Sequence, residues 1–174
     1  MSLLGEVITH LEKQQVRCGL IGGEALAVHG VARATLDSDL LVANPDVLRD
    51  SFWPTFSPRA AVEIRRGDPD DPLAGVVRVH RRTEQTDIVV GRPWVRRILH
   101  RTIRVRVRGQ ELPVVDRTDL VLLKLFAGGP QDLLDVRLLL EVGGKDLGDQ
   151  VERRLSGVPS EVGRTWRRVR SAPP

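Results

Sequence analysis

A glycine pair followed by an Asp-x-Asp motif constrains the fold of this chain more than any other feature. Gly22 and Gly23 end a short apolar run, and Asp37, Ser38 and Asp39 begin another. Residues two apart on a strand point to the same face, so both carboxylates lie on one side of the strand and Ser38 on the other. Glycines between a strand and a helix let a phosphate approach the backbone N–H groups. The pattern predicts a phosphate-binding turn beside a strand with two carboxylates. Ordinary turn glycines and a turn or capping aspartate are the structural alternatives.

A third aspartate, Asp87, lies between Thr86 and Ile88 in a further apolar run. An unpaired carboxylate is costly to bury there, so a metal ion or an arginine must compensate its charge, and we favour a metal. Carboxylates that converge repel by roughly 4 kcal/mol per close pair at an effective dielectric of about 20. We therefore predict that Asp37, Asp39 and Asp87 are catalytic and hold two Mg²⁺ ions, or Mn²⁺, with Asp87 also the general base toward an attacking hydroxyl.

The segment 22–40 combines the glycine pair with Arg33, Thr35 and the Asp-x-Asp motif. It resembles the minimal nucleotidyltransferase family, in particular its AbiEii-type toxin branch. The resemblance implies transfer of a nucleoside monophosphate from an NTP to a hydroxyl group, with release of pyrophosphate. It also implies that Gly22, Gly23, Arg33 and Thr35 contact the nucleotide.

The segment 121–136 resembles the later lysine and aspartate motifs of the same branch. This implies that Lys124 binds the nucleotide phosphates and that Asp132 is an active-site acid. Two structural alternatives remain. Lys124 can extend from a leucine-rich helix to solvent, and Asp132 and Asp135 can be helix-start acids that interact with the helix dipole.

Alternating strand-like and helical patterns predict an α/β fold with a mixed sheet flanked by helices. With the resemblance, we expect a polymerase-beta-like nucleotidyltransferase core at 1–115 and a short helical C-terminal segment at 116–174 packed on it. Predicted strands are 17–21, the segment with Asp37 and Asp39, 61–64, 75–79, 86–90, 102–107 and 112–115, and predicted helices are 2–15, 24–29, 116–126 and 130–142, followed by one or two short basic helices.

Arginine is concentrated in one stretch that contains no acidic residue, and this local positive charge can attract a polyanion. RNA is the partner we consider first. With 3% aromatic residues and no tyrosine, the chain has few side chains that can stack on bases, so contacts with RNA would be to phosphates. Because the last three arginines alternate with apolar residues, a strand face that points to water explains them equally well. The stretch contains Arg92, Arg96, Arg97, Arg101, Arg104, Arg106 and Arg108.

Together these features favour a metal-dependent nucleotidyltransferase that uses an NTP and modifies RNA, such as tRNA. The toxin-branch resemblance implies a role in a toxin–antitoxin system, with a cognate antitoxin as partner. An antibiotic or small-metabolite nucleotidyltransferase is the alternative enzyme, and a non-catalytic basic nucleic-acid-binding module is a third possibility that the three aspartates oppose. With no apolar run of about 18 residues and no basic leader with a cleavage site, we expect a soluble cytoplasmic protein without membrane contact.

Overall fold

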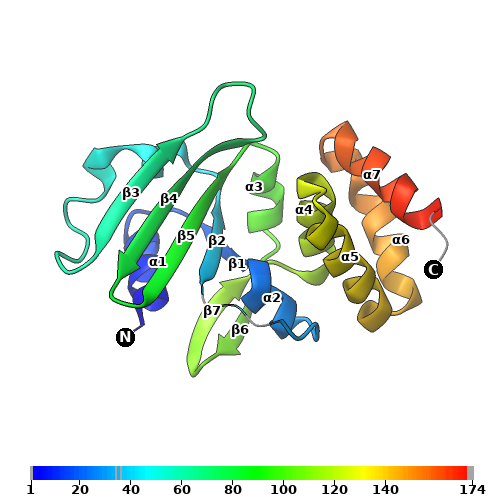
Figure 1. Ribbon diagram of the computed structural model, residues 1–174, viewed down its shortest axis with the longest axis horizontal. Helices are drawn as coiled ribbons and strands as arrows, with labels where there is room; N and C mark the ends of the chain where they lie inside the picture. Colours follow the sequence, from blue (N-terminus) through cyan, green and yellow to red (C-terminus); the bar gives the residue numbers. More distant parts are fainter. Residues whose placement is uncertain (1, 34, 36, 172–174) are drawn as a thin grey trace.

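The computed structural model describes residues 2–33, 35 and 37–171, and its strands form one mixed sheet in the order β3-β4-β5-β2-β1-β7-β6. The predicted α/β fold is confirmed. β2 runs parallel to β5 and antiparallel to β1, which in turn pairs in parallel with β7 (Figure 1). The strands are β1 (Cys18–Ile21), β2 (Ser38–Val42), β3 (Ala61–Arg66), β4 (Leu73–Arg81), β5 (Glu84–Gly91), β6 (Ile103–Val107) and β7 (Gln110–Val114).

The four helices predicted by residue range are present, with small differences at their ends, whereas the short helix Val95–Leu99 is not among those predicted. The N-terminal helix is capped by Ser2, whose hydroxyl accepts from the Gly5 N–H. The segment that begins at Pro45 is a 3-10 turn capped by Asn44, whose side chain accepts from the Asp46 N–H. The helices are α1 (Leu3–Lys13), α2 (Gly22–Val28), η1 (Pro45–Leu48), η2 (Asp50–Phe52), α3 (Val95–Leu99), α4 (Arg117–Ala127), α5 (Pro130–Gly143), α6 (Lys145–Arg154), η3 (Leu155–Gly157) and α7 (Ser160–Ser171).

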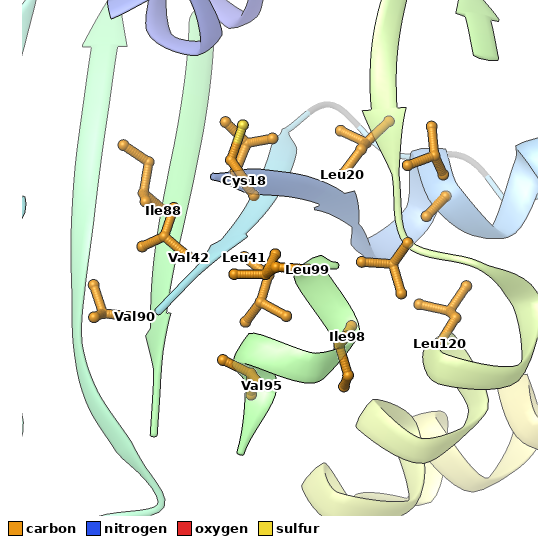
Figure 2. Packing of buried hydrophobic residues seen from close by; sticks show 14 of the residues in the cluster. Cys18, Leu20, Leu41, Val42, Ile88, Val90, Val95, Ile98, Leu99 and Leu120 are labelled. Atoms are coloured by element: carbon orange, nitrogen blue, oxygen red, sulfur yellow. The ribbon is translucent and has the colours of Figure 1, made fainter. Parts of the chain in front are cut away.

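The central strand β2 is covered on both faces, because Leu40, Leu41 and Val42 are all buried. Figure 2 shows α3 lying close to Leu41 and Val42 and to residues of β5. Cys18 on β1 lies in the same core. Burial raises the pKa of its thiol to about 12, as expected for a structural cysteine rather than a nucleophile.

Outside this centre, β4 and β5 alternate between buried and partly exposed residues. Val77, Val79 and Ile88 point into the core, and α1 packs against β5. Arg78 and Asp87 alternate with these residues and therefore lie on the other, more open face. The period-2 pattern thus leaves one sheet face available for polar chemistry.

Helices α4 to α7 lie together at one end of the sheet, next to α2 and α3 (Figure 1). α4 contributes Leu120, Val121 and Leu125 to the same hydrophobic cluster as the strands, and Trp166 of α7 joins it. Within residues 2–171, no helix described by the structure has the length and apolar character needed to cross a membrane.

Candidate active site

The structure places Asp39 and Asp87 directly opposite each other on the parallel strands β2 and β5. Side chains opposite each other on neighbouring strands share a face, so the two carboxylates lie side by side. Asp37 lies one residue before β2 begins. Burial raises the pKa of Asp39, and the negative charges of Asp87, Asp37 and Glu24 raise it further. The three predicted carboxylates therefore act on one another electrostatically.

The glycine pair lies against this group. Gly22 has φ +65, and a Cβ at this position would collide with the Asp39 carboxylate. A Cβ on Gly23 would lie 2.8 Å from the Thr35 Cβ. The antiparallel pairing of Ile21 with Asp39 explains this close approach, because it brings the end of β1 beside the start of β2. The turn thus needs glycine both for its backbone conformation and for space.

Asp87 is held by an arginine that the sequence analysis did not identify. Arg78 lies opposite it on β4, with Nε 3.0 Å from Oδ1 and Nη2 2.8 Å from Oδ2. Arg78 thus compensates the charge of Asp87, as the arginine alternative of the sequence analysis expected, and metal binding by Asp87 stays a prediction. The Asp87 carboxylate raises the pKa of Arg78, which therefore stays charged. A single arginine between two valines of a predicted strand was the available sequence signal.

The side chains fit a divalent cation only in part. Oxygen ligands suit Mg²⁺, and neither Asp37 nor Asp39 forms an ion pair with any other described residue. Among the residues with assigned positions, however, no three His, Cys, Asp or Glu side chains are arranged to hold a metal ion. Asp87 would serve as a ligand with a carboxylate whose two oxygens Arg78 also binds.

A second group of charges links α4, α5 and the segment before β2. Lys124 Nζ lies 2.8 Å from Asp132 Oδ1 and 2.8 Å from Asp135 Oδ2, and Arg33 Nη1 lies 2.7 Å from Asp135 Oδ2. Burial acts to lower the pKa of Lys124, but its hydrogen bonds to the two aspartates outweigh burial and raise it. The charge of Lys124 also lowers the pKa of Asp39. Lys124, Asp132 and Arg33 thus belong to one charged network, and the positive charge of its lysine acts on Asp39.

Thr35 and Glu24 have structural contacts at the edge of this site. The Thr35 hydroxyl donates to the Asp37 carbonyl at 2.9 Å and so shapes the approach to β2. Glu24, in the first turn of α2, is buried, and Arg108 lies 2.9 Å from its Oε1, whereas its Oε2 has no partner among the described residues. Sequence reasoning missed Glu24, because nothing in the local pattern indicates a buried carboxylate.

A groove of about 510 Å³ lies beside Asp87. Arg78 and Asp87 line it, together with Arg65 and Arg66 of β3. It therefore connects the proposed base with an arginine-lined surface on the open side of the sheet.

The arginines between 92 and 108 do not form one continuous stripe. Several bind groups of the protein itself. Arg92 donates to backbone carbonyls of Asp68, Pro69 and Asp71, and Arg101 donates to Asp119. Arg104 pairs with Glu12 and Arg108 with Glu24. Arg96, Arg97 and Arg106 are exposed. The positive charge available to RNA is smaller than the sequence suggests, and RNA binding stays a prediction.

No family model and no curated protein matches this chain. Its fold resembles TM1012 from Thermotoga maritima, which is assigned to the nucleotidyltransferases, with a TM-score of 0.54 and 14% identity over 80% of this chain and 91% of that chain. It also resembles an antigenic nucleotidyltransferase-like protein from Paracoccidioides brasiliensis, with a TM-score of 0.51 and 13% identity over 94% of this chain and 90% of that chain. The chain therefore has a nucleotidyltransferase-like fold. The toxin branch stays a prediction.

Proposed function

We propose that this protein transfers a nucleoside monophosphate from an NTP to a hydroxyl acceptor. The observation that carries the proposal is the register of Asp39 against Asp87, with Gly22 packed on the Asp39 carboxylate. The nucleotidyltransferase-like fold supports it. In the reaction, the acceptor oxygen attacks the α-phosphorus, the bond to the bridging oxygen breaks, and pyrophosphate leaves.

Asp37, Asp39 and Asp87 would hold Mg²⁺ or Mn²⁺. A bound divalent cation would activate the acceptor hydroxyl and stabilise charge on the leaving pyrophosphate. Asp87 takes the hydroxyl proton on a carboxylate oxygen once Arg78 has moved away. Lys124, positioned by Asp132, directs its ammonium toward the phosphates, and Gly22, Gly23, Arg33 and Thr35 shape the nucleotide side of the site.

For the acceptor, we propose RNA, such as tRNA, because Arg65 and Arg66 line the groove beside Asp87 and can contact phosphates. Action as a toxin controlled by an antitoxin is the corresponding biological proposal. A small molecule such as an antibiotic is the second candidate, because a groove of about 510 Å³ falls within the usual size range of small-ligand pockets.

In the test, the protein is incubated with each NTP, labelled at the α-phosphate, and Mg²⁺ or Mn²⁺. Total RNA, aminoglycosides and protein extract are supplied as acceptor pools in separate reactions. We expect label in the RNA pool. Label only in the aminoglycoside pool would establish the second candidate, and no label in any pool with any NTP would contradict the proposed activity.

Asp39→Asn is expected to reduce transfer by about 10²-fold or more, because it removes a negative charge from the centre of the site. The matched control is Asp70→Asn, which makes the same change in an exposed loop residue. Transfer by Asp39→Asn at the parental rate would show that the chemistry does not depend on this carboxylate.

A further inference from the structure

A small cavity of about 190 Å³ lies between α3 and the segment that joins α6 to α7. Its charged lining consists of four arginines: Arg97 in α3, Arg101 just after it, and Arg153 and Arg154 at the end of α6. No described residue lining the cavity is acidic. Arginines far apart in sequence are thus gathered around one partly open cavity.

The positive charge of this cavity is only partly neutralised. Arg101 Nε and Nη2 each lie 2.8 Å from a carboxylate oxygen of Asp119, and Arg154 Nη1 lies 2.7 Å from Asp116 Oδ2. These bonds leave further N–H groups of both guanidinium groups free to donate. Arg97 and Arg153 form no ion pair with another described residue. Four arginines against two aspartates leave an excess of 4 − 2 = 2 positive charges.

A buried donor without a partner lies in the same lining. The indole Nε1 of Trp94 is buried and has no hydrogen-bond partner among the residues that the structure describes. Buried N–H groups are normally paired, so one without a partner calls for a ligand or other explanation. An edge-to-face contact with Phe126, with ring centroids 5.0 Å apart, orients the Trp94 ring.

Arg97 of α3 lies close to the segment that joins α6 to α7. A Cβ on Gly157 would lie 2.9 Å from Arg97 Nη1, so the guanidinium lies close to the η3 backbone, although Arg97 as a whole is exposed.

We propose that this cavity binds a phosphate group. Its charged and indole side chains offer N–H donors and net positive charge, and planar guanidinium groups match the oxygens of a phosphate. The volume is below the usual range for a whole small-ligand pocket, which fits a phosphate or diphosphate group better than an entire nucleotide. The phosphate can belong to an RNA strand or to a free phosphorylated compound. The lining shares no residue with the proposed transfer site, so this inference does not depend on the proposed function.

The test measures binding by calorimetry without NTP or divalent cations, using inorganic pyrophosphate and a single-stranded oligoribonucleotide as separate probes. Arg97→Gln combined with Arg153→Gln is expected to weaken binding of at least one probe by about tenfold or more. The control combines Arg137→Gln with Arg167→Gln, which removes the same charge from exposed helix positions outside the cavity lining and outside the arginine stretch 92–108. Circular dichroism checks that both double variants fold.

Trp94→Phe keeps an aromatic ring but removes the N–H, and we expect a smaller loss of binding, of a few fold. Pyrophosphate binding without RNA binding identifies a free phosphorylated compound as the ligand. RNA binding whose salt slope falls by about 1.4 in the cavity double variant identifies a strand, because each lost phosphate contact contributes about 0.7. Equal weakening in the control, or no binding of either probe by the parent, overturns the proposal.

Discussion

Arg78 shows how much the role of one carboxylate depends on its neighbour across the sheet. Because Arg78 holds both oxygens of Asp87, a cation must compete with a guanidinium for this ligand. Arg78→Gln is expected to lower the Mg²⁺ concentration that gives half-maximal transfer. A Mg²⁺ titration of activity measures this, with Arg65→Gln as control, since Arg65 lines the same groove without bonding to Asp87. An unchanged Mg²⁺ requirement in Arg78→Gln would mean that the pair does not restrain Asp87.

His29 gives a prediction about pH. It is buried, with Nε2 2.8 Å from the Val115 carbonyl, and burial lowers its pKa from the ordinary value of 6.5. Below pH 6.5 the unfolded chain takes up a proton that the folded protein resists, so stability falls as the pH decreases through this region. The Tm of the parent should therefore drop between about pH 7.5 and 5.5, more than that of His29→Gln. His100→Gln, at an exposed histidine, should keep the parental slope.

At the scale of elements, one glycine at the start of α2 and another just after its end allow the effect of backbone conformation on stability to be separated from the effect on transfer activity. Gly22 and Gly30 both have positive φ, +65 and +90, but a Cβ at Gly30 meets nothing within 4 Å. Alanine at either position should cost about 1–2 kcal/mol of stability because of the left-handed backbone. Only Gly22→Ala should also abolish transfer, since its Cβ displaces the Asp39 carboxylate. Thermal denaturation and NTP transfer measure the two effects, and equal activity in the two variants would contradict the proposed close approach.

The elements themselves follow from local patterns, which explains why their order is predictable. Alternating valines predict β4 and β5, and Asp116 at the start of a leucine-rich run predicts α4. The partners of charged side chains depend instead on which strands and helices become neighbours. The Arg78–Asp87 pair requires the β4–β5 register, and the contact between Arg33 and Asp135 joins segments far apart in the chain. For the same reason, the arginine stretch looks uniform in sequence but is divided among different surfaces in the folded protein.

For the whole molecule, charged contacts and a continuous core connect the sheet with the C-terminal helices. Asp119 of α4 is completely buried and accepts from Arg101, which follows α3, while Arg154 at the end of α6 lies 3.1 Å from the same carboxylate. We propose that the segments 1–115 and 116–174 therefore unfold together, in one calorimetric transition.

Asp119→Ala tests this coupling. It leaves Arg101 without its carboxylate partner, while Arg154 keeps Asp116, and should destabilise the protein by about 1–3 kcal/mol. Asp149→Ala, an exposed residue of α6, should change stability by no more than about 0.5 kcal/mol. Two separate transitions in the parent would show that the helical segment is an independent unit. A single transition that splits only in Asp119→Ala would instead identify this buried carboxylate as the main link between the sheet and the helices.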